Sequence, residues 1–264
     1  MNQTKNEILQ KRENGVHWIM FNRPESRNAM TVGMEQTIIE VSRQINEDPE
    51  VKAVIFTGAP ADRPSFMAGA DFDSLKKATT PEEFVKLERN GEAVQIAVEQ
   101  IKVPTIAAMA GACVGGGALL AASCDVRIAS PSVKFGLPIA RTVGNCLSVQ
   151  NYARLTSTLG YALTKDMIFS ARLLTADDLL GVHAIREIVS DADLHSKAEE
   201  IAEQLKTLAP LTLYATKEAL RRLRDQPVAA IPDDDLISAC YASSDFREGV
   251  AAFMEKRKPR WLGR

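Results

Sequence analysis

Three consecutive glycines, Gly115-Gly116-Gly117, separate two apolar runs, residues 105–110 and 118–122. The first run is short and apolar enough to be a buried strand, and the second predicts a helix that begins at the glycines. A helix that begins in a glycine turn leaves several N–H groups unbonded at the positive end of its dipole. The sequence therefore predicts a strand–turn–helix unit that can hold a phosphate, a carboxylate or an oxyanion at the turn.

The residues around the glycines limit which ligand this turn can bind. No Lys-Ser or Lys-Thr follows them, which argues against a P-loop, and the G-x-G-x-x-G pattern fails at Leu120. An oxyanion hole remains. A second loop, residues 67–72, contains Gly69 and can offer another backbone donor to the same oxygen. The alternative for each loop is a simple turn.

Strands alternate with helices over the first half of the chain, which predicts an α/β fold with a parallel sheet. Helices dominate after about residue 147, and residues 227–232, with a proline at each end, predict a hinge. Strands are expected at 16–22, 51–57, 105–110, 125–129, 133–135 and 185–189. Helices are expected at 32–47, shortly after Asp71, and at 81–101, 147–159, 161–169, 175–180, 192–208, 211–224, 233–242 and 245–256.

Composition excludes several classes of protein. The 32 basic and 34 acidic residues give a net charge of −2, so no basic surface is expected to recruit nucleic acid or an anionic membrane. No apolar run approaches the roughly 18 residues of a membrane span. Four scattered cysteines and three histidines indicate neither a zinc site nor a disulfide framework. We therefore expect a cytoplasmic protein.

Several motifs in this order resemble the crotonase (enoyl-CoA hydratase/isomerase) superfamily over nearly the whole chain. They are Asn22-Arg23-Pro24 with Asn28-Ala29-Met30, the stretch 66–71, the strand 102–107, the glycine turn, Cys124-Asp125, Phe135-Gly136-Leu137-Pro138, and the tail motifs 247–249 and 255–258. The resemblance implies a crotonase-like spiral of ββα units over residues 1–200. It also implies a helical C-terminal region, 201–264, that builds trimers or hexamers.

The resemblance further implies an acyl-CoA thioester substrate, with coenzyme A as part of the substrate and no permanently bound cofactor. The backbone amides of Ala70 and Gly116 match the oxyanion-hole donors of the family. The coenzyme A contacts map onto Ser26, Arg27, Ala29, Ala68, Asp71 and Phe72, and, from a neighbouring subunit, onto Phe253 and Lys256.

Two positions depart from the family pattern. Hydratases of this family use two glutamates as general acid and base, and this chain has Leu119 and Ile139 at those places. Asp125 is the one acidic residue between Glu99 and Asp166, and it matches a structural position. The expected acyl pocket is therefore apolar, and activation of water by the usual pair is not expected.

Polar residues nearby are limited to the segment after Ile139, which we place in the acyl pocket. Arg141 is a candidate for binding a carboxylate on the acyl group, and the alternative is a surface ion pair. Asn145 is a candidate for holding a water or a carbonyl, and the alternative is a helix N-cap ahead of Leu147.

Three hypotheses follow for the function. The first is an acyl-CoA enzyme that stabilises a thioester enolate, with decarboxylation as a reaction that needs no base. The second is a hydratase or isomerase whose acids come from another segment, such as Glu88 or Glu92 on the 81–101 helix. The third is a protein that binds acyl-CoA thioesters without turnover.

Overall fold

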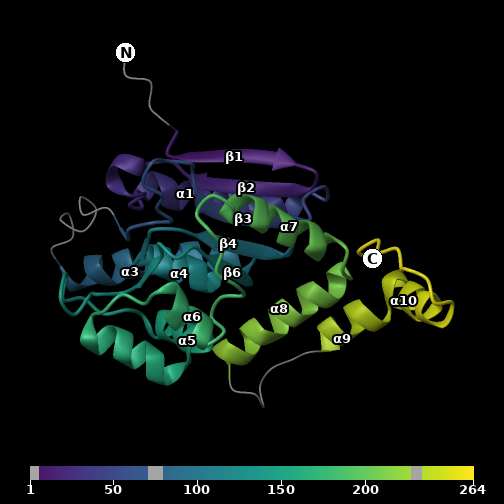
Figure 1. Cartoon of the computed structure of the whole chain (residues 1–264). Helices are drawn as coiled ribbons and strands as arrows, with labels where there is room; N and C mark the ends of the chain where they lie inside the picture. The colour runs from purple at the N-terminus through teal and green to yellow at the C-terminus, as the bar shows by residue number, and fades with distance from the viewer. Residues whose placement is uncertain (1–5, 71–79, 227–233) are drawn as a thin grey trace.

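A five-stranded sheet forms the centre of the molecule (Figure 1). The computed structural model describes residues 6–70, 80–226 and 234–264. In spatial order the strands are β1 (Ile8–Glu13), β2 (Val16–Phe21), β3 (Ala53–Gly58), β4 (Thr105–Met109) and β6 (Val126–Ala129). β2, β3, β4 and β6 run parallel, and β1 pairs antiparallel with β2. The predicted parallel α/β sheet is confirmed. β1 was not predicted, because five of its six side chains are exposed and it lacks an apolar pattern.

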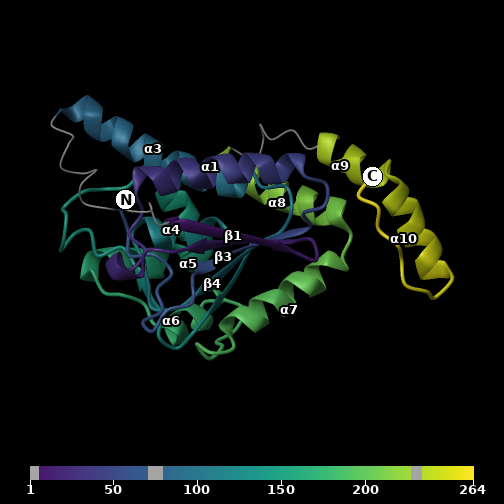
Figure 2. The same ribbon diagram turned by 90° about the horizontal axis from the view of Figure 1, so that it is seen from above.

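Helices cover both faces of this sheet, so the central strands are buried on both sides. α1 (Val32–Glu47), α3 (Pro81–Glu99) and α4 (Gly116–Ser123) pack on one face, and α7 (Leu194–Lys206) packs on the other (Figure 2). Side chains therefore alternate along β3. Val54 and Phe56 face the layer of α1, α3 and α4, and Ala53 and Ile55 pack with α7.

A second, two-stranded parallel sheet leads the chain into the glycine turn. It consists of β5 (Ala112–Val114) and β7 (Lys134–Gly136). The preceding loop joins it, since Met67 N donates to Ala112 O at 2.7 Å and Met67 O accepts from Val114 N at 2.8 Å. β5 was not predicted, because three residues between two glycines are too few for a periodic pattern to be recognised.

The other helices agree with the expected ranges at most positions. They are α5 (Val149–Ser170), α6 (Ala176–Gly181), α8 (Pro210–Asp225), α9 (Asp234–Tyr241) and α10 (Ser244–Met254). The short 3-10 helix η1 (Pro24–Ser26) was not predicted. α5 spans two predicted helices that meet at Gly160, whose φ of 76° breaks the helix as expected. The strand predicted at 185–189 is wrong: only Ile188 forms an isolated bridge, with Ala129. The helix expected after Asp71 and the hinge at 227–232 lie outside the described residues.

The C-terminal helices α8, α9 and α10 extend from the body of the molecule, and the tail folds back onto them (Figures 1 and 2). Trp261 Nε1 donates to Thr207 O at 3.0 Å, and Asp245 accepts from the backbone N–H groups of Leu262 and Gly263. The domain boundary near residue 200 stays a prediction. In the parts of the chain given above, no helix is both long and apolar enough to cross a membrane.

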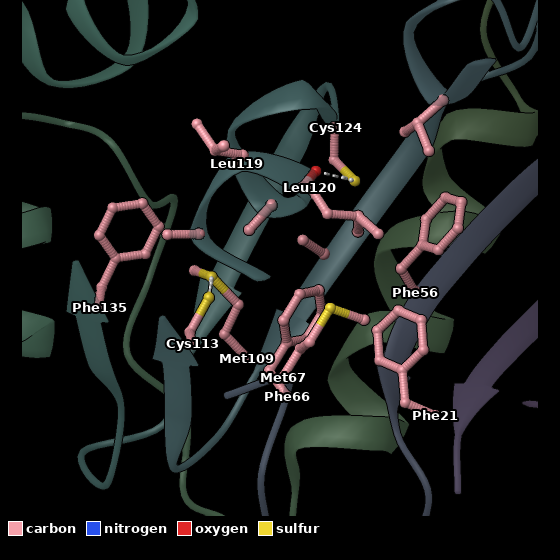
Figure 3. Packing of buried hydrophobic residues seen from close by; sticks show 14 of the residues in the cluster. Phe21, Phe56, Phe66, Met67, Met109, Cys113, Leu119, Leu120, Cys124 and Phe135 are labelled. Carbon is pink, nitrogen blue, oxygen red and sulfur yellow. Dashed lines mark hydrogen bonds between the residues drawn. The ribbon is translucent and has the colours of Figure 1, made fainter. Parts of the chain in front are cut away.

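Sulfur-containing and aromatic side chains fill the core beneath the glycine turn (Figure 3). Cys113 is fully buried, and its Sγ lies 3.6 Å from Met109 Sδ. Burial raises the pKa of the Cys113 thiol, which keeps it protonated and unreactive. Cys113 is therefore a packing residue of the core.

Acidification is expected to destabilise the fold through His17 of β2. This fully buried imidazole shares one hydrogen bond, between Nε2 and Gln10 Oε1 at 3.0 Å, and its Nδ1 has no partner among the described residues. Burial lowers the pKa of His17 from 6.5 to about 4. Below pH 6.5 the unfolded chain therefore binds a proton at His17 that the folded chain does not bind. The free energy of unfolding decreases as the pH falls from 6.5 to 4.

Urea unfolding across this pH range measures the effect, and His17→Leu removes the titrating group. The variant should lose less stability on acidification than the original protein. An equally steep loss in both would assign the pH dependence to other groups.

Candidate active site

Three chain segments end at one place beside the core. They are the loop 66–70, the turn between β5 and α4, and the stretch after β7. Hydrogen bonds join them: Met67 pairs with β5 as described above, and Gly115 N donates to Gly136 O at 2.9 Å. Because paired strands run parallel here, their carboxyl ends meet at the same edge. The two glycine-containing loops that the sequence singled out are thus adjacent.

Glycine is required where these loops touch. Gly115 has a φ of +57°, and a Cβ added there would lie 3.2 Å from Gly69 Cα. A Cβ on Gly117 would lie 2.4 Å from Met67 O, closer than real contacts allow. The two backbones can therefore approach this closely only because glycine has no side chain.

Two backbone N–H groups are left without an acceptor at this contact. Gly116 is the first residue of α4, and the earliest N–H of this helix to bond inside it is that of Leu119, to Gly115 O. Ala70 follows Gly69, whose carbonyl accepts from Met30 N at 2.7 Å. Within the described residues, neither Ala70 N nor Gly116 N has a hydrogen-bond partner.

Both loops open into one cavity of about 320 Å³. Its lining combines a backbone part, an apolar part and a polar part. The backbone part comes from Ala68, Gly69, Ala70, Gly115 and Gly116. The apolar part includes Met30, Leu87, Leu119, Leu137, Ile139 and Leu147. The polar part includes Glu35, Glu88, Glu92, Gln95, Asn145 and Asn151.

Leu119 and Ile139 face this cavity and are otherwise buried, with 6% and 9% of their surfaces exposed. Neither side chain can transfer a proton. Any proton transfer in the cavity therefore depends on the polar part of the lining.

Glu88 and Glu92 lie one turn apart on α3, and both are held by the start of α5. Glu88 Oε1 accepts from Ser148 N at 2.8 Å and from Asn151 Nδ2 at 3.1 Å. Glu88 Oε2 has no partner in the described part of the chain. Glu92 is more fully bonded, with Arg89 Nη1 at 2.5 Å and Ser148 Oγ at 3.1 Å.

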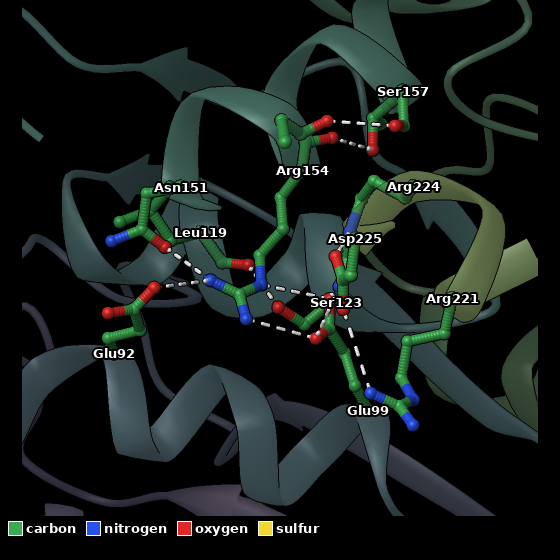
Figure 4. A network of polar contacts seen from close by, with 12 residues as sticks. Glu92, Glu99, Leu119, Ser123, Asn151, Arg154, Ser157, Arg221, Arg224 and Asp225 are labelled. Atoms are coloured by element: carbon green, nitrogen blue, oxygen red, sulfur yellow. Dashed lines mark hydrogen bonds and ion pairs between the residues drawn. The ribbon is translucent and has the colours of Figure 1, made fainter. Parts of the chain in front are cut away.

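Arg154 of α5 lies between Glu99 and this polar part of the lining (Figure 4). Its side chain is buried and bonds Glu99 with Nε at 2.9 Å and with Nη2 at 3.1 Å. Its Nη1 donates to Asn151 Oδ1 at 2.9 Å and lies 3.6 Å from Glu92 Oε1. The network joins α3 to α5 and fixes the orientation of two cavity-lining residues, Glu92 and Asn151.

Two further polar side chains in the lining are unpaired. Gln95 is 2% exposed, and its Oε1 has no partner among the described residues. Glu35 of α1 is half-buried, and no described residue bonds its carboxyl group. Burial raises the pKa of Glu35 above 4.5, so its protonated form persists to a higher pH than usual.

Four of the expected coenzyme A contacts, Ser26, Arg27, Ala29 and Ala68, lie at the cavity or on the segment bonded to it. Ala68 lines it and donates its N–H to Arg27 O at 3.0 Å, which joins the segment with Ser26, Arg27 and Ala29 to the oxyanion loop. Asp71 and Phe72 lie outside the described residues, as does the side chain of Phe253. Lys256 is exposed after α10, away from the residues that line the cavity.

The segment after Ile139 differs from the expectation. Arg141 is exposed and does not line the cavity, although it was expected in the acyl pocket. The chain forms an exposed turn here, in which the N–H groups of Arg141 and Gly144 donate to Pro138 O at 3.0 Å and to Ile139 O at 2.8 Å. Asn145 does line the cavity, but it does not cap α5; Ser148 does so by accepting from Asn151 N.

Glu35, Gln95 and Asn151 are the cavity residues that sequence reasoning missed. Glu88, Glu92, Gln95 and Glu99 follow each other at helical spacing, which is usual for a solvent-facing stripe. This polar stripe was the one feature of the sequence that pointed to these residues. The periodicity does not show that the stripe faces a cavity. Glu35 stands next to the apolar stripe of α1, where a charged residue has no distinctive pattern.

The family model for enoyl-CoA hydratase/isomerase matches residues 11–264. The chain is 32% identical over 255 residues to the short-chain-enoyl-CoA hydratase of Clostridium acetobutylicum, covering 96% of each. It is 30% identical over 264 residues to the crotonyl-CoA hydratase of Syntrophomonas wolfei, covering 98% of this chain and 99% of the relative. Its fold is similar to the crystal structure of an enoyl-CoA hydratase from Bacillus anthracis, with a TM-score of 0.85 and 27% identity, covering 98% of this chain and 100% of the other.

Proposed function

Since the chain belongs to the enoyl-CoA hydratase/isomerase family and has the expected crotonase-like α/β fold, we propose that it acts on acyl-CoA thioesters at the cavity described above. The proposed reaction is proton transfer on an enoyl thioester, with hydration as the first case to test. The observation that carries this proposal is that both glycine loops and Glu88 line the same cavity. The similarity to two proteins named as hydratases supports the same choice.

The N–H groups of Ala70 and Gly116 are the proposed oxyanion-hole donors. They have no other acceptor among the described residues, and the contact between Gly69 and Gly115 brings their loops together. Donors fixed in advance toward a thioester oxygen stabilise the negative charge that develops in an enolate. Both donors belong to backbone segments that are hydrogen-bonded to β5 and β7. These bonds limit how far the N–H groups can move during the reaction.

Glu88 is the proposed general base in place of the missing family glutamates. Its Oε1 is held by Ser148 N and Asn151 Nδ2, while its Oε2 is left for a water or a substrate proton. Glu92 is less suited, because Arg89 and Ser148 occupy its two oxygens. A base that is oriented by hydrogen bonds and faces the reacting group meets the geometric requirement for proton transfer.

Decarboxylation is disfavoured by the charges in the cavity. A carboxylated acyl group needs a cationic partner, and the candidate Arg141 is exposed and outside the lining. The ionisable side chains that line the cavity, within the described part of the chain, are Glu35, Glu88 and Glu92, and none of them can carry a positive charge. A substrate carboxylate would be repelled there.

A catalytically silent acyl-CoA-binding protein is the second candidate, favoured by the apolar Leu119 and Ile139. Under either candidate, we propose the same coenzyme A contacts, which are Ser26, Arg27, Ala29, Ala68, Asp71 and Phe72. Phe253 and Lys256 are proposed to contact the coenzyme A of a neighbouring subunit, which requires a trimer or hexamer.

Hydration of crotonyl-CoA, followed by the loss of enoyl absorbance and by mass spectrometry of the product, tests the proposal. The unaltered protein should turn the substrate over, and Glu88→Gln should lower kcat by ~10²–10⁴-fold, the usual contribution of a general base. Glu82→Gln, an exposed residue in the first turn of the same helix, is the matched control and should leave kcat unchanged. Binding of the thioester without turnover would favour the silent candidate.

A further inference from the structure

We infer that Glu35 is a second catalytic residue in the same cavity, the acid that donates a proton to the substrate while Glu88 acts as the base. This inference rests on the proposed function, because it assigns a role within that reaction. It is independent of the family pattern, whose two acid positions are Leu119 and Ile139 here.

Addition of water to an enoyl thioester needs one group that accepts a proton and another that supplies one. Three carboxyl groups line the cavity in the described part of the chain, and they differ in their hydrogen-bond partners. Glu92 is 4% exposed and is committed to Arg89 and Ser148, with Arg154 beyond. With both of its oxygens hydrogen-bonded, Glu92 has none free to exchange a proton with the substrate.

Glu88 and Glu35 differ in ways that suit opposite roles. Glu88 accepts two hydrogen bonds at Oε1, which hold its carboxyl group in place, and its Oε2 has no partner among the described residues. Glu35 receives none from any described residue and is half-buried on α1, where burial raises its pKa. The other titratable groups that line the cavity in the described chain are Glu88 and Glu92 of α3, and neither is a cation that would keep Glu35 ionised. One carboxyl group that two donors hold in the cavity and another that is half-buried there without a partner are suited to act as base and acid.

The proposed step adds one water molecule across the C2–C3 double bond of the enoyl group. Glu88 Oε2 takes one proton from a water molecule while the water oxygen bonds to C3 of the enoyl group. The electron pair of the C2–C3 double bond moves toward C2 and the thioester oxygen, which the N–H groups of Ala70 and Gly116 stabilise. Glu35 then gives its carboxyl proton to C2. The net change is the addition of one water, and exchange with solvent returns the proton from Glu88 to Glu35.

Glu35→Gln tests this inference with crotonyl-CoA. The variant should lower kcat by ~10²–10⁴-fold while thioester binding, measured by calorimetry, is retained. Because the acid must be protonated to act, kcat of the unaltered protein should fall as the pH rises through the pKa of Glu35. That fall should be absent from the residual activity of the variant. The melting temperature should change little, since no described residue bonds the carboxyl group that is replaced.

Glu40→Gln is the control on the same helix, where the side chain is exposed and bonded to Arg43. It should leave both kcat and the pH profile unchanged. Equal kcat and an identical pH profile for Glu35→Gln and the unaltered protein would overturn the role of Glu35 and leave the proposed hydration intact. No turnover by the unaltered protein, with thioester binding retained, would overturn the hydration itself and the role of Glu35 with it.

Discussion

Replacing Gly116 with proline is expected to lower kcat for a thioester substrate by ~10²–10³-fold, the usual cost of one oxyanion-hole donor. Proline removes the backbone N–H and keeps the helical φ, and it is well tolerated at the first position of a helix. Gly116 occupies that position in α4, and its N–H bonds no described residue. The substitution therefore removes the proposed donor with little effect on the helix. Steady-state kinetics with crotonyl-CoA measure the loss.

Gly116→Ala is the matched control, because alanine keeps the N–H group. Among the described residues, a Cβ at this position would meet only Met30 Cε, at 3.9 Å, which is an ordinary contact. The alanine variant should retain most of the activity, and both variants should melt at similar temperatures. A large loss in both would show that the site responds to bulk at residue 116, and the proposed role of its N–H would then be wrong.

Replacing Arg154 with methionine should destabilise the protein by about 3–5 kcal/mol, the typical cost of removing one partner of a buried ion pair. Arg154 is 2% exposed and bonds Glu99 and Asn151 in the network of Figure 4. Methionine preserves much of the volume but leaves Asn151 Oδ1 without its donor. Because Asn151 also orients Glu88, the variant should lose activity at temperatures where it is still folded. Urea unfolding and activity assays measure the two effects.

Arg43→Met serves as the comparison, since Arg43 makes its ion pairs with Glu40 and Glu47 on the exposed side of α1. Solvent screens such pairs, and little change in stability is expected. Equal stability of the Arg154 and Arg43 variants would show that the buried network contributes little. A stable Arg154→Met variant with full activity would also contradict its role in orienting Asn151.

Much of the backbone of the candidate site could be predicted from local sequence. Gly115 and Gly117 are needed where backbones approach closely, and such requirements are visible in the residue types themselves. Thr31 caps α1 and Pro81 begins α3, as their sequence positions indicate. The resemblance to a known family then linked the two loops, and the structure places Ala70 and Gly116 in the lining of one cavity.

The polar lining could not be predicted in the same way. Arg141 lies in an exposed turn, and Ser148 caps α5 in place of Asn145. Glu35 and Gln95 come from helices whose spacing gives no sign of a cavity. Such placements depend on contacts between residues that are distant in the chain, as between Glu88 and Ser148.

The sequence by itself determined the α/β class and the strand–glycine–helix turn, because these follow from local backbone preferences. The loss of the usual acid pair stays a prediction from the resemblance to the family. Only the tertiary structure decided which polar groups face the cavity. A helical period shows that Glu88, Glu92 and Gln95 share one face of α3, but not whether that face meets water, Arg154 or a substrate. Packing of α1, α3 and α5 around the glycine turn settles that question, and with it the choice of residues for the proposed proton transfers.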